Sequence, residues 1–172
     1  MDEQFASAPA SLFRRMAALS YDLLLMAALL LVLTFALLPL TAGEAILTST
    51  HGLIGHLYHA LQLLLAFGYF GICWTRGGQT LGMKAWRIRI ETVDGRPPNW
   101  GNAIVRFMIG ATLLLLAVTG SWQLQTPGWN LGDLAALLLV LPAPVNLAWV
   151  LFDREGRSLQ DRAGQLRLLR LD

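Results

Sequence analysis

The sequence predicts an all-α membrane protein, a four-transmembrane-helix bundle with a small cytoplasmic β element, and three observations predict it. Apolar residues make up 55% of the 172 residues. Charged residues make up 14%, against roughly 25% in an ordinary soluble domain. Four long segments contain no Lys, Arg, Asp or Glu, namely residues 23–43, 45–75, 107–132 and 134–152. This much apolar surface exceeds what one core of this size can bury, so we expect it to face lipid.

The four uncharged segments predict helices over about 16–38, 53–74, 103–122 and 131–152, because a membrane span needs about 20 apolar residues. Pro39 ends the first helix, and a loop signal made of Gln123, Gln125, Thr126, Pro127 and Gly128 ends the third. Pro142 and Pro144 lie inside the fourth helix and should bend it, since proline has no amide proton for the helix ladder. We interpret residues 1–172 as a single membrane domain.

The basic residues predict the orientation of these helices. Twelve of the thirteen fall before the first helix, between the second and third, or after the fourth, and Arg106 lies near the start of the third, whereas the loops at 39–52 and 122–130 contain none. Basic residues in short loops stay on the cytoplasmic side. We therefore expect both termini, the segment 76–102 and the tail 153–172 in the cytoplasm.

A short strand is expected in the segment between the second and third helices. Residues 86–91 alternate between apolar and charged side chains, which is typical of a strand, and a turn follows at 93–95. A strand of this length needs a partner, and the tail at 165–171 is the available one. We predict a small sheet under the helices, with Arg87 and Arg89 facing water or lipid head groups.

Two charges of the first helix invite a functional interpretation. Arg15 and Asp22 are seven residues apart, so they lie on one helical face, with Asp22 about 10 Å deeper. A carboxylate at such depth costs at least about 2.5 kcal/mol and should find a partner, for which Arg106 is a candidate. Two interpretations stay open: a structural ion pair that holds helices together, or a cation or proton site.

Other motifs argue against catalysis and metal binding. The segment 77–84 resembles a phosphate-binding loop, but Met83 stands where the lysine is required. No arrangement of nucleophile and base and no paired carboxylates suggest hydrolysis, so we expect no enzyme and no cofactor. His51, His56 and His59 lie near one end of the second helix, where hydrogen bonding at the interface is favoured over metal binding. Asp133 is expected to cap the fourth helix, and Asn146 to bond a neighbouring helix or line a path.

Three motifs spread over the chain resemble the RDD family of membrane proteins. They are Arg15 to Ala18 with Asp22; Gly78 to Lys84 followed by residues 88–95; and Phe152 to Arg154 leading to Leu159 to Gly164. Gln160 stands where the family often has His, and Gln165 where it usually has Thr. The resemblance implies that Asp161 is the second aspartate of the family pattern. It also implies a multi-pass protein of the bacterial inner membrane. For this family transport has been proposed, and cation/proton antiport is reported for some members.

These observations support two functional hypotheses. In the first, the protein is a small transporter, a homo-oligomer in which Asp22 exchanges a proton for a monovalent cation, with Arg15 and Arg106 as charge partners. In the second, it is a non-transporting accessory or assembly subunit that binds lipid head groups or a membrane-protein partner, with Arg15 and Asp161 locking the first helix to the tail. No nucleic-acid partner is expected. A polar cleft at Asp22 would favour transport, and a packed Asp22 the second hypothesis.

Overall fold

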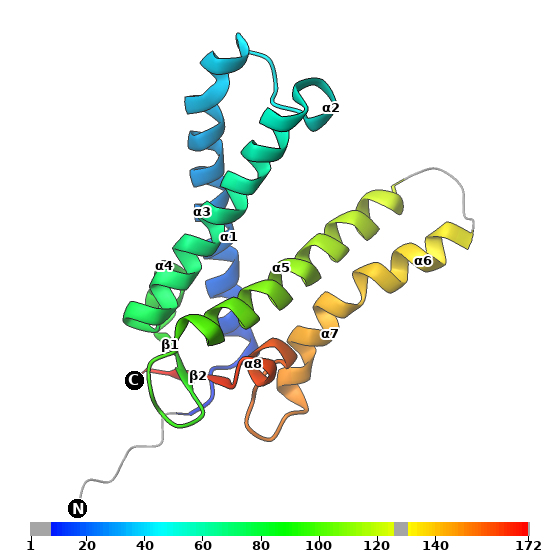
Figure 1. Ribbon diagram of the computed structural model, residues 1–172. Coiled ribbons are helices and arrows are strands. Elements are labelled where there is room, and N and C mark those ends of the chain that lie inside the picture. Colours follow the sequence, from blue (N-terminus) through cyan, green and yellow to red (C-terminus); the bar gives the residue numbers. More distant parts are fainter. Residues whose placement is uncertain (1–7, 126–130, 172) are drawn as a thin grey trace, which may run out of the picture.

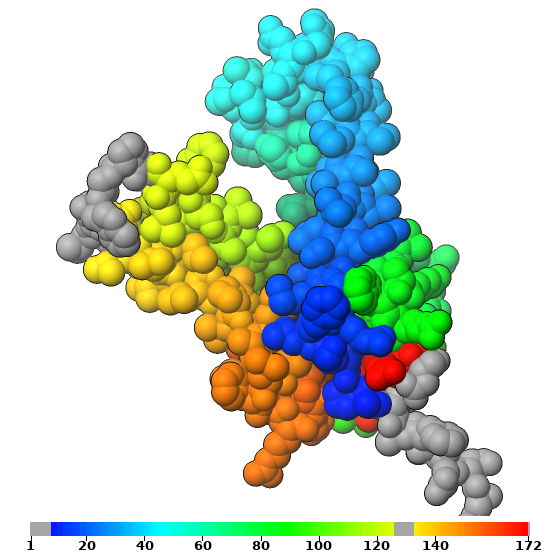
Figure 2. Space-filling view, turned by 180° about the vertical axis from the view of Figure 1, so that it is seen from behind, coloured from blue at the N-terminus to red at the C-terminus, as the bar shows by residue number. Residues whose placement is uncertain are grey.

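The computed structural model describes residues 8–125 and 131–171, and it consists mostly of helices. Four helical segments are long and apolar enough to cross a membrane: Leu12–Thr41, Leu53–Gly77, Trp100–Gln123 and Asp133–Leu151. Figure 1 shows that they form two diverging arms, the first made of α1 and α3 and the second of α5, α6 and α7. The arms meet at a base that contains a small sheet and two short helices. The space-filling view confirms the hollow between the arms (Figure 2).

The first arm begins four residues before the predicted start of the first helix. Helix α1 (Leu12–Leu37) starts at Ser11, whose hydroxyl accepts the Arg14 amide proton, so the basic residues form its first turn. The 3₁₀ turn η1 (Leu38–Thr41) follows, then the short α2 (Thr48–His51) and α3 (Leu53–Gly77). The first arm therefore carries Arg15 and Asp22 on one continuous helix.

The second arm is interrupted where the two prolines predicted a bend. Helix α5 (Trp100–Gln123) begins with a capping box between Asn99 and Asn102, three residues before the expected start. The fourth span divides into α6 (Leu131–Val140), α7 (Pro142–Ala148) and the 3₁₀ turn η2 (Trp149–Leu151). The break falls at Leu141, because Pro142 cannot donate the next helical hydrogen bond.

The predicted sheet is present at the base. Strand β1 (Ile88–Thr92) pairs antiparallel with β2 (Leu166–Arg170), and Ile90 lies opposite Leu168. The strand expected at 86–91 therefore begins two residues later, and its partner is the tail, as the sequence predicted.

Both outer edges of this sheet are covered. The Ile90 amide donates to the Gly78 carbonyl (2.8 Å), and the Ala10 amide donates to the Leu168 carbonyl (2.9 Å). Gly78 has a left-handed backbone (φ +65°), and a Cβ there would lie 2.7 Å from the Ile90 carbonyl oxygen. Only glycine therefore fits where α3 ends against β1. The covered edges bind the sheet to both the N-terminal segment and α3.

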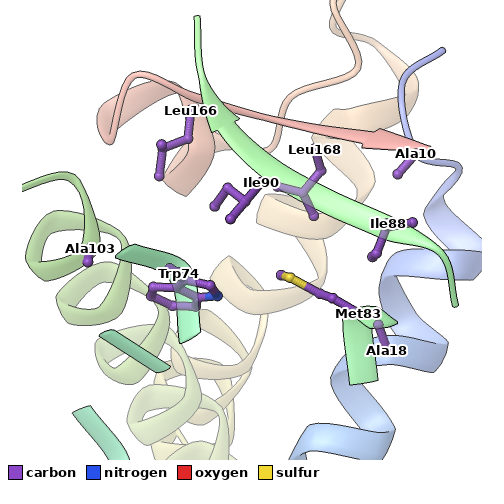
Figure 3. Packing of buried hydrophobic residues seen from close by; sticks show 9 residues of the cluster. All are labelled: Ala10, Ala18, Trp74, Met83, Ile88, Ile90, Ala103, Leu166 and Leu168. Carbon is purple, nitrogen blue, oxygen red and sulfur yellow. The ribbon is translucent and has the colours of Figure 1, made fainter. Parts of the chain in front are cut away.

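The hydrophobic core lies between the sheet and the inner ends of the helices. Figure 3 shows Trp74 and Met83 directed toward the apolar side chains of the two strands. Met83 belongs to the short helix α4 (Leu81–Ala85), and a second short helix, α8 (Leu159–Ala163), precedes β2. The core consists of Ala10, Ala18, Trp74, Met83, Ile88, Ile90, Ala103, Leu166 and Leu168. The arms beyond it expose large apolar side chains, as lipid-facing helices do.

The thirteen basic residues lie in the base or at the helix ends that enter it, as their positions in the sequence required. Which side of the membrane the base faces stays a prediction of the positive-inside pattern.

Candidate functional site

Three of the predicted charged residues meet in one buried cluster at the base. Arg15 lies in the first turn of α1, Arg106 in the second turn of α5, and Asp161 in α8. The Arg15 Nη1 donates to Asp161 Oδ2 (2.7 Å), and Arg106 Nη1 forms an ion pair with Asp161 Oδ1. The Asp161 side chain is 0% exposed. A single carboxylate therefore joins the two arms.

Arg15 extends this cluster to two further segments. Its Nε donates to the Ala10 carbonyl (2.9 Å), and its Nη2 donates to the Gly156 carbonyl (2.6 Å). One guanidinium thus binds the segment that covers β2, the loop before α8 and Asp161. The planar fork of donors in arginine makes this three-way contact possible, which lysine would not reproduce.

Arg106 connects the cluster to the hydrophobic core. Its guanidinium carbon lies 5.0 Å from the centroid of the Trp74 ring, a cation–π contact with α3. The cluster of Arg15, Arg106 and Asp161 holds two positive charges and one negative charge. Removing the carboxylate would leave two buried cations without their anion.

Asp161 is itself positioned by the first turn of α8. Its amide donates to Ser158 Oγ (3.3 Å), and the Ser158 amide donates to Asp161 Oδ2 (3.3 Å), a reciprocal capping box. The Asp161 side chain therefore starts the helix that carries it and also binds the two arginines.

Asp22 lies in a separate pocket of hydrogen-bond donors. It is 3% exposed. Tyr69 donates its hydroxyl to Oδ1 (2.9 Å), the Gly82 amide also donates to Oδ1 (2.9 Å), and Thr80 donates to Oδ2 (2.5 Å). These donors come from α3 and from the start of α4, so Asp22 holds both against α1.

A second set of hydrogen bonds holds the two hydroxyl donors in place. The Leu81 amide donates to the Tyr69 hydroxyl oxygen (3.3 Å), and the Met83 amide donates to Thr80 Oγ1 (3.1 Å). Each hydroxyl group therefore accepts one backbone proton and donates its own proton to Asp22, so it is held from both sides. A carboxylate has about four lone-pair sites, and these donors occupy three of them.

Gly82 allows this close approach of α4 to α1. A Cβ at this position would lie 2.2 Å from the Ala18 carbonyl oxygen and 2.9 Å from the Asp22 carboxyl carbon. Any other residue would push α4 away and break the hydrogen bond of its amide to Asp22.

The structure places Arg15 and Asp22 as expected but gives Arg106 a different partner. Arg15 and Asp22 lie on the same buried face of α1, as their spacing required. Arg106 was expected beside Asp22, but it pairs with Asp161, because its side of α5 faces α8, while donors of α3 and α4 surround Asp22. Among the described residues, Asp22 forms no ion pair.

Sequence reasoning missed the donors around Asp22. Tyr69 carries no local signal that distinguishes it from other residues of an apolar helix. Gly82 lies in the motif from Gly78 to Lys84, but that motif does not indicate that its amide binds Asp22. Thr80 does carry one, because a threonine directly before a short helix is a favoured N-cap. Its second role toward Asp22 depends on a contact 58 residues away in the sequence.

The remaining predicted residues lie outside these clusters. Arg87 is exposed in the turn before β1 and Arg89 is exposed on β1, so both stay candidates for lipid head groups. His51 bonds Thr50 and His59 bonds Gln62, and the described part of the chain contains no group of three or more potential metal ligands. Asn146 is buried, and its Oδ1 accepts the Gln160 amide proton from α8 (3.1 Å).

Four spanning helices joined by buried charges to a small basic base define a multi-pass membrane protein. The sequence profile of the RDD family matches residues 9–165, so the chain belongs to the RDD family. This match includes Arg15, Asp22, Arg106 and Asp161. No curated protein and no solved structure significantly matches the chain.

Proposed function

We propose that this RDD family membrane protein is a non-transporting accessory or assembly subunit. In this function, Asp22 and the cluster of Arg15, Arg106 and Asp161 hold the base in a fixed position against the four spans. The base then presents its basic surface, including Arg87 and Arg89, to lipid head groups or to a membrane-protein partner.

The hydrogen-bond network around the buried Asp22 carries this proposal. Its carboxylate accepts three hydrogen bonds, and the two hydroxyls among the donors are fixed by backbone amides. A cation bound at Asp22 would compete with these donors, which already occupy three of the about four lone-pair sites of the carboxylate. Each lost hydrogen bond to a charged group costs about 1.5–3 kcal/mol, which favours a structural role.

Cation/proton exchange through Asp22 is the second candidate, because carboxylates within membrane spans are functional by default. The presence of Asp22 in a candidate span favours it, while the packing around the side chain does not. A transporter of four spans would need a second copy to enclose a path, so exchange also requires a homo-oligomer.

Ion flux in proteoliposomes tests the two candidates. Purified protein is reconstituted with a pH-sensitive dye inside, and a Na⁺ or K⁺ gradient is imposed on wild type, Asp22→Asn and protein-free vesicles. We expect equal dye responses from all three. We also expect Asp22→Asn to melt at a lower temperature than wild type, because an amide NH₂ would face hydrogen-bond donors.

Cation-dependent proton flux in wild type that disappears in Asp22→Asn, at equal protein incorporation, would overturn the proposal and establish exchange. Asp94→Asn is the control, since Asp94 is an exposed aspartate of the β1–α5 loop. Its flux and melting temperature should equal those of wild type.

A further inference from the structure

Unpaired basic residues gather in one segment of the base. Among the described residues, five basic side chains form no hydrogen bond or ion pair, and four of these lie between the end of α3 and β1. The four are Arg76, Lys84, Arg87 and Arg89, and the fifth is Arg154 in the loop between η2 and α8. Other cations of the base have acidic partners within the protein, as Arg167 has in Glu91 (2.7 Å). This segment therefore carries positive charge for which the fold supplies no partner.

Lys84 and Arg87 are held close together by a backbone turn. The Arg87 amide donates to the Lys84 carbonyl (3.2 Å), and both side chains are exposed. Arg87 has a left-handed backbone (φ +50°), which is uncommon for any residue but glycine and marks a constrained position. Its carbonyl accepts the Leu171 amide proton (2.8 Å), which fixes the turn to the end of β2. The fold thus presents two cations at the two ends of a single fixed turn.

Exposed apolar side chains border this turn. Phe13 is 70% exposed and stacks edge to face on Trp86, with ring centroids 5.5 Å apart. The Arg14 guanidinium donates to the Trp86 carbonyl (2.9 Å) and holds the pair in place. Leu81 is also exposed on α4. We call Phe13, Leu81, Lys84, Trp86 and Arg87 the α4 surface.

The α4 surface lies where the spans enter the base. The Leu81 amide donates to the hydroxyl of Tyr69, a residue of the spanning helix α3, and α1 continues upward from Phe13. Figure 1 shows α4 beside the inner end of α3. Aromatic rings beside cations at this level are typical of side chains at the membrane interface, where the rings enter the glycerol region and the cations meet phosphate.

We propose that Lys84 and Arg87 bind the head-group phosphate of an anionic phospholipid, with Phe13, Leu81 and Trp86 against its glycerol and upper acyl region. This inference deepens the proposed function, on which it rests, by giving the lipid class and the residues of the site. A membrane lipid is favoured over a soluble anion because the apolar part of the surface adjoins the cations directly. It is favoured over a protein because the surface lies at the bilayer boundary.

Native mass spectrometry of the detergent-solubilised protein tests this site. Phosphatidylglycerol and phosphatidylcholine are titrated separately into wild type and into the double variant Lys84→Gln with Arg87→Gln. Each cation near an anionic surface contributes roughly five-fold in affinity. We expect preferential binding of phosphatidylglycerol to wild type, and a loss of roughly 25-fold in the double variant.

A matched double variant controls for net charge. Arg96→Gln with Arg154→Gln removes the same two charges from exposed positions in other loops of the base, and it should keep wild-type affinity. All proteins should melt at the same temperature, because every substituted side chain is exposed.

Three results would overturn the proposal: equal losses in the two double variants, equal binding of both lipids to wild type, or displacement of phosphatidylglycerol by millimolar inorganic phosphate. The last would identify a soluble anion as the ligand. The flux experiment is independent of this binding. If one of these three results were obtained while the proteoliposomes showed no cation-dependent proton flux, the lipid site would be refuted and the proposed function would still stand.

Discussion

Replacing Asp161 with Asn tests whether the cluster of Arg15, Arg106 and Asp161 holds the two arms together. The substitution keeps the size of the side chain, and the amide oxygen can still cap α8. It removes the negative charge between two arginines that are themselves buried. An amide NH₂ would also face a guanidinium, so a donor would meet a donor. The change therefore removes the negative charge of Asp161 while the volume of the side chain stays the same.

The expected loss is large because two cations lose their anion. Breaking a buried ion pair by removing one partner costs about 3–5 kcal/mol. For a chain of this length, 1 kcal/mol corresponds to about 2–4 °C in melting temperature, so we expect a decrease of roughly 6–20 °C. Asp94→Asn is the control, because the pair of Asp94 with Arg96 is exposed, and such pairs contribute about 0–1 kcal/mol.

Thermal unfolding in detergent, followed by tryptophan fluorescence, measures this difference. A second comparison adds Arg106→Met to Asp161→Asn. The decrease in melting temperature of the double variant should be smaller than the sum of the decreases of the two single variants, because the substitution at 106 removes one of the two cations that Asp161→Asn leaves without an anion. The reasoning would be refuted if Asp161→Asn melted within 2 °C of Asp94→Asn, or if the losses at 106 and 161 were additive.

Three further predictions concern the base and its orientation. Gly82→Ala should lower the melting temperature, because its Cβ would lie 2.2 Å from the Ala18 carbonyl oxygen, whereas Gly77→Ala, with nothing within 4 Å, should not. Equal melting temperatures of these two variants would argue against the packing of α4 on α1. In a Cys73→Ser background, cysteines at 89 and 169 should be linked by a short bifunctional thiol reagent, since Arg89 lies opposite Leu169. Cysteines at 89 and 167 should link less, and the reverse order would contradict the register. A membrane-impermeant thiol reagent applied outside intact cells should label a cysteine at position 44 and spare one at 94. Labelling of both would contradict the orientation.

The features that depend on composition and periodicity could be predicted from the sequence. Absence of charge located the four spans, because the bilayer excludes charged side chains over a known thickness. Alternation at 86–91 located the strand, and its pairing with the tail followed because a strand of this length requires a partner. Pro142 located the break of the fourth span. Except for this pairing, each signal lies within one segment of the chain.

The partners of the buried charges could not be predicted in the same way. Spacing placed Arg15 and Asp22 on one face of α1, but the choice between Asp22 and Asp161 as the partner of Arg106 depends on how α5 is rotated against α8. The identity of Gln160 does not indicate that rotation either, because its contact with Asn146 of α7 is made by its backbone amide. The donors to Asp22 were missed because hydroxyls and a backbone amide are present throughout any sequence. Only the fold brings Tyr69, Thr80 and Gly82 to one carboxylate.

The buried charges explain why the two arms meet at one end and diverge at the other. Between helices in lipid, the hydrophobic effect supplies no attraction, so close packing and polar contacts decide which helices associate. Asp22 ties α1 to α3 and α4, and Asp161 ties α1 to α5, all at the base. Farther out, Thr34 on α1 bonds Tyr58 on α3 within the first arm (2.6 Å). The base therefore fixes where each helix enters the membrane, and the arms diverge beyond the last of these polar contacts.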